Sequence, residues 1–351
     1  MVATASSAHL AHDRRAGIGD LTSLGPLRRG AHVLVVGDGN FSYAQAFLRA
    51  QSIRIRAAEI TLTATSLDTE PELLEMYPKS RSILENLRHG NVHVRHGVDA
   101  TKLSSYFSQN RADSVKFDRI VFNFPHYAGH ERGGDKTVHN KIHRHRQLLR
   151  DFFASASQVL TREGQVWVTL CAGQGGTKLE RRPRAQGDTW HIVHCAAAAK
   201  FVLHDAHFCP VRALAAFGYY SVGYQAREKA FWTHDSITHV FVHEGRGRQS
   251  CFPIEWNRDV SFWITDEHSF SEDLLHGIVQ EHFSPETMSV AISLHDEYRC
   301  KQSARKAVTY RLAISSFALA LTRDRVNVLT EKALTAIESS CFGASRRTTA
   351  F

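Results

Sequence analysis

Between residues 32 and 242 the chain repeats short apolar runs, separated by segments of helical character. In each run both odd and even positions carry Val, Ile, Leu or Phe, which is typical of strands covered on both faces. The predicted strands are His32–Val36, Ile60–Thr65, Val92–Arg95, Phe117–Phe122, Gln165–Leu170 and Thr238–Val242. Strands that alternate with helices in this way predict an α/β fold built on a parallel sheet.

This rhythm stops in the Gly- and Arg-bearing stretch Gly245–Arg258. Beyond it we expect two helices and three longer strands, and a last short strand. These elements are Asp259–Thr265, helix Ser269–Phe283, Glu286–Glu297, Arg305–Phe317 and helix Thr322–Ser339, with Thr322 as N-cap. The order is that of the split βαβ, ferredoxin-like α+β domain.

The chain is therefore predicted to have four parts. Residues 1–30 mix Ala, Ser, Gly and Arg without period and predict a flexible leader. An α/β domain follows at 31–245, then a linker at 246–258, then the α+β domain at 259–351. The leader's arginines would suit a mitochondrial presequence, but its acidic residues argue against one. We expect a cytoplasmic or nucleolar protein, with mitochondria as the alternative.

The composition indicates a soluble protein with a polyanionic partner. No apolar run approaches the roughly 18 residues that a membrane span needs, so no membrane partner is expected. The six cysteines are scattered without a CxxC pair, and we interpret them as reduced, intracellular and mostly structural. Lys and Arg outnumber Asp and Glu by 43 to 35, which gives a net charge of +8 and favours nucleic acid.

Three histidines lie in the basic stretch 136–150 (KTVHNKIHRHRQLLR). Its apolar positions predict a helix with one wet, basic face, which either is simply solvated or contacts phosphates. A metal site is the lesser alternative, because no carboxylate or cysteine partner lies nearby. We predict no metal.

The first predicted strand runs directly into the loop Gly37-Asp38-Gly39-Asn40-Phe41-Ser42, after which Tyr43–Ala50 has helical character. Glycines let the chain turn tightly and approach a ligand, while the helix N-terminus offers N–H groups. The third glycine of GxGxxG is missing, since Ser42 stands in its place. Alone, the loop favours a nucleotide-like ligand over a simple strand-to-helix turn.

Two acidic residues follow the next two predicted strands. Asp68 comes 31 positions after Gly37, and a carboxylate there can accept both ribose hydroxyls of an adenosine. That interval is longer than the roughly 20 residues of nicotinamide-binding units. Asp99 follows the third strand and could meet the adenine amino group. Either residue could instead be a helix N-cap.

The fourth predicted strand ends in Asn123-Phe124-Pro125-His126. Ligands bind at the carboxyl ends of strands in open α/β sheets. There Asn123 can hydrogen-bond a base edge, Phe124 can stack on the base, and Pro125 stiffens the turn. His126 could take a proton from a ring nitrogen, with an ordinary loop histidine as the alternative.

These sites lie within longer motifs, VGDGNFSYA, TATSLD, GVDATKL, FDRIVFNFPHYAG and RQLLRDFFASA. Together they resemble the eukaryotic methyltransferases that modify N3 of a uridine in large-subunit ribosomal RNA, over residues 32 to 243. The resemblance implies a Rossmann-like class I methyltransferase fold. It also implies S-adenosylmethionine as the cofactor and a target base at Asn123–His126.

Downstream, CAGQGGTKLE, DTWHIVHCAAAAKF and SVGYQAREKAF resemble a branch fused to a ferredoxin-fold anticodon-binding domain. The segments DVSFWI, LHDEY and TYRL resemble the C-terminal domain of phenylalanyl-tRNA synthetase β chains, over most of 255–351. No aminoacylation core precedes them. The resemblance therefore implies RNA contact and not tRNA charging.

The pattern of the second domain supports that implication. Its alternating apolar positions are expected under the two helices, which leaves Trp263 and Arg311 on the open sheet face. Stacking plus charge on such a face suits single-stranded RNA. Packing of Trp263 against the first domain is the alternative. The inward positions are Val260, Phe262, Ile264, Val308, Tyr310, Leu312 and Ile314.

Two departures from the ribosomal enzymes bear on the substrate. Asp38 stands where they commonly carry Glu, and Gly173–Asp188 differs from their shorter loop. We predict an S-adenosylmethionine-dependent RNA base methyltransferase, with uridine N3 of ribosomal RNA as first candidate and tRNA as an alternative substrate. A catalytically inactive factor that binds a ribosomal precursor particle is the main rival. A nicotinamide dehydrogenase is disfavoured by the missing glycine and by FNFPH.

Overall fold

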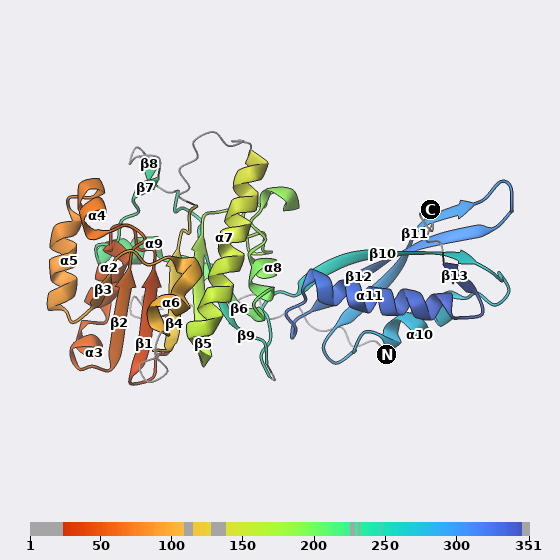
Figure 1. Cartoon of the computed structure of the whole chain (residues 1–351), viewed down its shortest axis with the longest axis horizontal. Helices are drawn as coiled ribbons and strands as arrows, with labels where there is room; N and C mark the ends of the chain where they lie inside the picture. Colours follow the sequence, from red (N-terminus) through yellow and green to blue (C-terminus); the bar gives the residue numbers. More distant parts are fainter. Residues whose placement is uncertain are drawn as a thin grey trace.

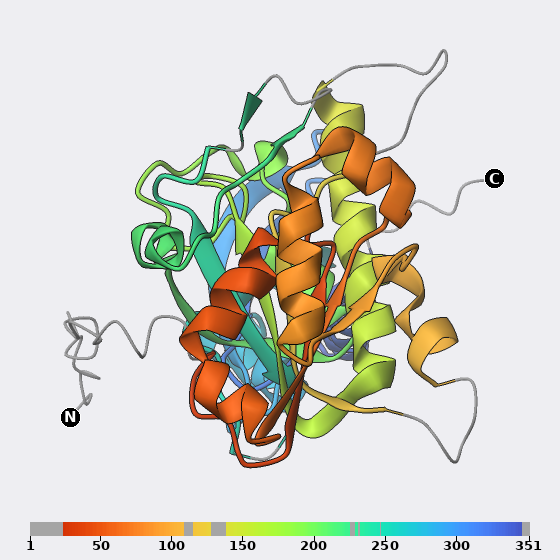
Figure 2. The same ribbon diagram turned by 90° about the vertical axis from the view of Figure 1, so that its left-hand side faces the viewer.

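The computed structural model describes residues 24–108, 115–127, 138–224, 229–230, 232–245 and 247–345. These residues form two units, each with its own sheet (Figure 1). Figure 2 looks at the first unit from the side of α3 and α5, with the second unit behind it. A small hairpin of β7 (Gly223–Tyr224) and β8 (Lys229–Ala230) is separate from both sheets.

The first unit is a seven-stranded sheet in the order β3-β2-β1-β4-β5-β9-β6. The strands are β1 (Ala31–Val36), β2 (Ile60–Thr65), β3 (His93–Arg95), β4 (Phe117–Asn123), β5 (Leu160–Leu170), β6 (Phe201–Phe208) and β9 (Ile237–His243). The Rossmann-like α/β fold is thereby confirmed, but a wholly parallel sheet is wrong. β9 runs antiparallel to both β5 and β6, because the segment between β6 and β9 returns to the end of the sheet that it left and does not cross over to the other end, as a parallel neighbour would require.

Helices cover both faces of this sheet. β1 shows this directly, since Leu34 and Val36 enter one buried cluster while Val33 and Val35 enter the other. The first face is covered by α6 (Leu103–Phe107), α7 (Val138–Val159) and α8 (Ile192–Ala197). The second is covered by α2 (Ser42–Ala50), α3 (Ser52–Arg56), α4 (Glu70–Met76), α5 (Ser80–His89) and α9 (Val211–Ala216). Because both faces are covered, odd and even positions of a strand are both buried, and both carry apolar residues.

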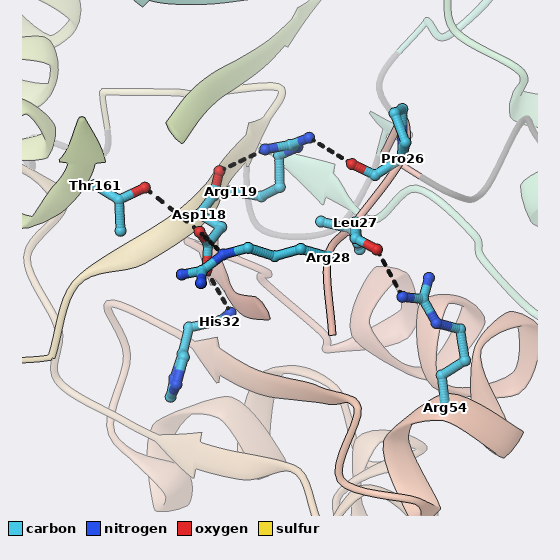
Figure 3. Close-up of polar contacts among 8 residues, drawn as sticks. All are labelled: Pro26, Leu27, Arg28, His32, Arg54, Asp118, Arg119 and Thr161. Carbon is cyan, nitrogen blue, oxygen red and sulfur yellow. Dashed lines mark hydrogen bonds and ion pairs between the residues drawn. The ribbon is translucent and has the colours of Figure 1, made fainter. Parts of the chain in front are cut away.

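At the amino end of β1, residues 24–30 are held by two neighbouring residues of β4 (Figure 3). Arg119, which is buried, donates to the carbonyl oxygens of Leu24 and Pro26, each at 3.0 Å. The Asp118 carboxylate accepts from Arg28 Nε at 3.0 Å and from the backbone N–H of His32 at 2.9 Å. The flexible leader predicted for 1–30 is therefore wrong from Leu24 onward, while its earlier part lies outside the described residues.

The second unit has the predicted ferredoxin-like order. Its elements are β10 (Ile254–Ile264), α10 (Glu272–Glu281), β11 (Ser289–Arg299), β12 (Lys306–Ser316), α11 (Arg323–Glu338) and β13 (Gly343–Ser345). All neighbours in the sheet β11-β12-β10-β13 are antiparallel. The Thr322 side chain caps α11 by accepting from the N–H of Arg325, as predicted.

β10 begins five residues before the predicted Asp259, inside the stretch assigned to a linker. In its first half, inward-facing side chains carry polar groups that bond to residues at and before α11. The sequence therefore lacks a clear alternation of apolar and polar residues there. Trp256 Nε1 donates to the Leu321 carbonyl at 2.8 Å, and Arg258 Nε donates to Asn327 at 2.8 Å. The two units are also tied together by Glu244, which accepts from Arg325 at 3.2 Å.

The inward face of the second sheet is buried as expected, from Val260 to Ile314. Trp263 lies on the other face, where its ring meets that of Tyr298 edge-on at 6.3 Å. The guanidinium of Arg305 lies 5.2 Å from the centre of the Trp263 ring. Trp263 thus contacts Tyr298 on β11 and Arg305 in the loop between β11 and β12, both in its own unit.

None of the helices in the described ranges combines the length and the apolar character that crossing a membrane requires. All six cysteines are free.

Replacing Arg119 tests the anchor of residues 24–30. We expect Arg119→Met to lower the free energy of unfolding by about 2 kcal/mol, because the buried carbonyl group of Leu24 and the partly exposed one of Pro26 lose a charged donor. Urea unfolding followed by circular dichroism measures this change. The control is Arg162→Met, at a side chain that is 95% exposed, for which a change below about 0.5 kcal/mol is expected. Equal stability of both variants would contradict the anchoring role.

Candidate active site at the carboxyl edge of the sheet

The predicted site residues follow the carboxyl ends of β1, β2, β3 and β4, and the sheet brings these ends together. The N–H of Asp38 donates to the Thr65 carbonyl at 2.9 Å, and that of Ser66 donates to the Arg95 carbonyl at 3.1 Å. Phe124 N–H continues the edge by donating to Thr169 at 2.8 Å. The loops after four strands therefore form one continuous rim.

The Asp38 side chain is buried behind the loop and caps α2. Its carboxylate accepts from the N–H of Ala44 at 2.7 Å and from that of Tyr43 at 3.4 Å. Burial raises the pKa of Asp38 to about 7, against the lowering effect of these two N–H groups. The carboxylate therefore holds the turn in place, and the predicted part of Asp38 in cofactor binding stays a prediction.

The three residues after Gly39 also turn their side chains inward. Asn40 Oδ1 accepts from the N–H of Ser42 at 3.1 Å, and Ser42 Oγ donates to the Tyr220 carbonyl at 2.9 Å. Phe41 is fully buried with a φ of 60°, a backbone conformation that few side chains adopt. Asn40, Phe41 and Ser42 therefore shape the loop, and only the two glycines remain partly exposed.

Gly37 is required by both conformation and space. Its φ is +62°, and a Cβ at this position would lie 2.8 Å from the ring of Phe122 on β4. A Cβ at Gly39 would only touch Val222, at 3.4 Å. The backbone at Gly37 and Gly39 is thus the part of the loop that a ligand can approach closely.

Asp68 and Asp99 have different surroundings. Asp99 caps the short helix η1 (Ala100–Lys102), because its Oδ1 accepts from the N–H of Thr101 at 2.9 Å and from its hydroxyl at 2.7 Å. Asp68 is not a cap, since Thr69 caps α4. Partial burial and nearby Glu72 raise the pKa of Asp68. Of the two, Asp68 is the better candidate for a ligand contact.

Asn123 ends β4 with its side chain fixed by neighbouring strands and helices. Its Oδ1 accepts from Thr169 Oγ1 at 2.7 Å, and Thr169 Oγ1 lies 3.0 Å from Thr238 Oγ1 on β9. Asn123 also lies beside the phenol of Tyr43 on α2, a residue whose pKa is raised by burial. The amide is therefore held in one orientation at the rim.

Phe124 does not offer the stacking surface that we predicted. Its ring is 9% exposed and belongs to the buried cluster beneath α2, with a φ of 50° at its backbone. Pro125 is also buried, whereas His126 and Tyr127 are exposed. The turn at Phe124 directs these last two side chains to the surface.

His126 is paired with His145 on α7. His145 is one of the three histidines in the stretch 136–150, for which we predicted a helix with one wet, basic face. His126 Nδ1 lies 3.2 Å from His145 Nε2. The His145 ring stacks on that of Trp190, with the ring centres 4.2 Å apart. His145 is buried, because Ile142, Leu149 and Phe152 define the inner face of α7 and His145 lies on it. The predicted basic face does exist, at residues such as Lys141 and His143.

The hydrogen bonds around His145 determine the tautomer of both rings. His145 Nδ1 lies 2.7 Å from the Lys141 carbonyl, which can only accept, so Nδ1 carries the proton. Its Nε2 then accepts from the N–H of Tyr127 and from His126 Nδ1. Partial loss of solvent around its ring and the neighbouring His145 lower the pKa of His126 to about 4. His126 is thus neutral near pH 7, with its lone pair on Nε2.

Several residues of this rim were missed. The segment after α9 packs on the Gly37–Ser42 loop and the start of α2. The ring centres of Tyr43 and Tyr219 are 6.2 Å apart, and the Tyr220 carbonyl accepts from Ser42 Oγ. No local signal points to Tyr219 or Tyr220. His145 could have been found from its spacing to Leu149 and Phe152 on the inner face of α7.

A glycine-rich turn after β5 closes the far side of the rim over His239. A Cβ at Gly175 would lie 2.7 Å from His239 Nε2, an atom that has no hydrogen-bond partner among the described residues. The other ring nitrogen, Nδ1, lies 3.3 Å from the Val168 carbonyl. Burial lowers the pKa of His239 to about 4. Within the described ranges, no group of three His, Cys, Asp or Glu residues could hold a metal ion.

Comparison with known proteins gives a family match over the rim. Residues 34–211, about half of the chain, match the model of the BMT5-like family, described as rRNA (uridine-N3-)-methyltransferase BTM5-like. The matched range contains the loops after β1 to β5.

Two curated relatives carry the name ferredoxin-fold anticodon-binding domain-containing protein 1. The chain is 36% identical to the Mus musculus homolog over 221 residues, which are 63% of this chain and 32% of that protein. It is 35% identical to the Homo sapiens protein over 210 residues, 60% of this chain and 30% of the relative. The chain thus spans about a third of the length of these relatives. Among solved structures, TrmN from Thermus thermophilus matches with a TM-score of 0.36 at 16% identity, over 64% of this chain and 48% of that one.

Two glycines with similar backbone angles test the requirement at Gly37. Gly97 has a φ of +68° but open space around its missing Cβ. We expect Gly97→Ala to cost about 1 kcal/mol of unfolding free energy, from backbone strain alone. Gly37→Ala should cost roughly 3 kcal/mol, because overpacking against Phe122 is added. Chemical denaturation compares the two, and equal losses would show that Phe122 can move aside.

His239 predicts a loss of stability in acid. Below its ordinary pKa of 6.5 the unfolded chain binds a proton that the folded chain refuses until about pH 4. The stabilising contribution is therefore full above pH 6.5 and is lost as the pH falls through 4. Over that window His239→Gln should lose less stability than the natural chain, by up to roughly 3 kcal/mol. Urea unfolding at stepped pH measures this, with exposed His204→Gln as the control that should follow the natural chain.

Proposed function

We propose a function from the premise that this chain belongs to the BMT5-like family, whose model is described as rRNA (uridine-N3-)-methyltransferase BTM5-like. The proposed activity is methylation of an RNA base by S-adenosylmethionine, with uridine N3 of ribosomal RNA as the first candidate. One observation carries the proposal: the glycine turn after β1 and the amide of Asn123, fixed by Thr169, lie on the same rim of strand ends. A cofactor at the first would face a base at the second.

The glycine turn and Asp68 support a bound S-adenosylmethionine. The backbone at Gly37 and Gly39, the two partly exposed residues of the Gly37–Ser42 loop, suits the approach of a flat or extended ligand. Next to Asp68, the Leu67 side chain is 55% exposed, which offers an apolar surface beside a carboxylate. That combination fits an adenosine, with its ring on Leu67 and its hydroxyls on Asp68. The cofactor supplies an activated methyl group, and the protein supplies alignment.

Asn123 and His126 are the proposed groups for the base. The Asn123 amide is oriented in advance by Thr169, so little ordering is needed when a base edge binds. His126 is a neutral acceptor in the tautomer that His145 imposes. Transfer to uridine N3 requires loss of the N3 proton, and His126 Nε2 is the proposed acceptor. A base within a paired stem must first be flipped out.

The second unit is the proposed RNA-binding module. Trp263 and Tyr298 with Arg305 provide stacking and charge on the open sheet face. The predicted role of Arg311 is weaker, because its guanidinium makes two bonds to Asp259, at 2.8 and 2.9 Å. Ribosomal RNA is the proposed substrate and tRNA the alternative. With a ribosomal substrate we propose a cytoplasmic or nucleolar location.

A second candidate is an inactive RNA-binding factor for a ribosomal precursor particle. The observation that favours it is that the Asn123 side chain already bonds to Thr169 within the protein. Calorimetry with S-adenosylmethionine separates the two, since an assembly factor without the chemistry needs no cofactor.

Replacing Asn123 tests the proposed chemistry. Asn123→Ala should abolish methyl transfer to ribosomal RNA, while S-adenosylmethionine affinity changes by less than about threefold, because alignment is lost and the cofactor loop is untouched. Transfer of a radiolabelled methyl group and calorimetry give the two readouts. The control is Asn86→Ala, at an exposed position of α5, which should keep both. An active Asn123→Ala protein would refute the assignment.

A further inference from the structure

The loop between β5 and α8 exposes a run of arginines beside the candidate active site. It contains the segment Lys178-Leu-Glu-Arg-Arg-Pro-Arg184, and residues 181–187 are all exposed. We name Arg181, Arg182 and Arg184 the basic tip. None of these three residues has a role in the proposed chemistry.

A buried carboxylate anchors the first half of this loop. Glu180 accepts from the N–H of Gly173 at 2.6 Å and from that of Gly175 at 3.1 Å. These glycines allow the fold, since a Cβ at Gly173 would lie 2.8 Å from Arg184 Nε. The turn thus wraps around Glu180, which immediately precedes the basic tip.

A buried arginine anchors the second half. Arg146 on α7 donates to the carbonyl oxygens of Gly187 and Thr189, both at 2.7 Å. The base of the loop is closed by Trp190 N–H, which donates to the Gln174 carbonyl at 2.7 Å. The basic tip is therefore held between two buried, oppositely charged anchors.

Fixed anchors matter for binding because ordering a flexible loop costs free energy when a partner binds. Three guanidinium groups on a fixed loop are organised in advance. Internal partners do not fully neutralise them: Arg181 pairs with Asp235 at 3.1 Å, at an Arg181 side chain that is 64% exposed. A polyanion can therefore reach them.

The position of the loop connects the candidate active site to the second unit. At one end Trp190 stacks on His145, the partner of His126. On the loop itself, Lys178 pairs with Glu255 on β10 at 2.8 Å. A chain that runs from the open sheet face of the second unit to His126 would pass this loop.

We propose that the basic tip binds the sugar–phosphate backbone of the RNA whose base enters the candidate active site. This inference rests on the proposed function and deepens it. Guanidinium groups bind phosphate oxygens through paired N–H groups, and such contacts position an RNA without reading its sequence. The loop is therefore the element that fixes how far the target base lies from the second unit.

RNA is favoured over an acidic protein by what surrounds the tip. The loop is continuous with a rim that carries the proposed base contacts, and the exposed ring of Tyr127 lies beside Arg144 at 5.7 Å. Aromatic and cationic groups side by side suit stacked bases and phosphates together.

The test compares two triple variants of the full chain. The first is Arg181→Gln with Arg182→Gln and Arg184→Gln. The matched control is Arg29→Gln with Arg56→Gln and Arg162→Gln, which removes the same charge from exposed residues at the opposite, amino edge of the sheet. Binding of a fluorescent oligouridylate is measured by anisotropy over a range of salt concentrations, and thermal unfolding confirms that both variants fold.

We expect the tip variant to bind the oligouridylate about tenfold more weakly and the control to bind within about twofold of the natural chain. The slope of log affinity against log salt should fall by about 2 in the tip variant, since each single-strand phosphate contact contributes about 0.7. Equal losses in both variants would mean a net-charge effect and would overturn the proposal. So would unchanged binding by the tip variant.

A single substitution tests the anchoring separately. Glu180→Gln keeps every arginine but weakens the bonds to Gly173 and Gly175. We expect about threefold weaker binding of the oligouridylate, even though a negative charge beside the tip is removed, and an unchanged salt slope because the three arginines remain. Unchanged affinity would show that the anchor is unnecessary.

Failure of this inference differs from failure of the proposed function. If the natural chain binds RNA and transfers methyl groups while the tip variant does the same, only the basic tip is refuted. If the natural chain binds neither RNA nor S-adenosylmethionine, the proposed function falls and the basic tip with it.

Discussion

The buried carboxylate of Asp38 fixes the turn on which the candidate active site depends. By accepting from two N–H groups of α2, it joins the end of β1 to the start of the helix. That bond turns the side chains of Asn40, Phe41 and Ser42 inward and leaves the glycine backbone outside. It also sets Tyr43 against Asn123. Burying a carboxylate is costly, which raises the pKa of Asp38 to about 7, and the N–H groups at the start of α2 offset part of that cost.

The sequence predicted most elements because their periodicity is local. β2 was placed to the residue, and the buried face of β12 followed from simple alternation. The direction of β9 and the existence of β6 were missed. β6 carries exposed His204 and Asp205 in its middle, which is a permitted pattern for an edge strand but breaks the apolar run. Direction depends on the connection between strands and not on the residues of the strand itself.

The sequence predicted where along the sheet the candidate site residues lie, but not which of their side chains point outward. Strand ends indicated where Gly37, Asp68 and Asn123 would lie, since parallel strands end at one edge. Which side chains point outward depends on distant partners. Ser42 is fixed by Tyr220 and Asn123 by Thr169, residues far along the chain that no local pattern connects. The stacking role expected of Phe124 failed for the same reason, because the ring is buried beneath α2.

Because β6 and β9 are antiparallel, the segment that joins them leaves β6 and enters β9 at the same end of the strands. That segment includes Tyr219 and Tyr220, which contact the cofactor loop and lie beyond the 34–211 range shared with the family. An excursion of this kind can lengthen, shorten or change its residues without disturbing a single strand of the ladder. The wall around the Gly37–Ser42 loop can therefore change its residues while the strands that carry the candidate active site keep their pairing.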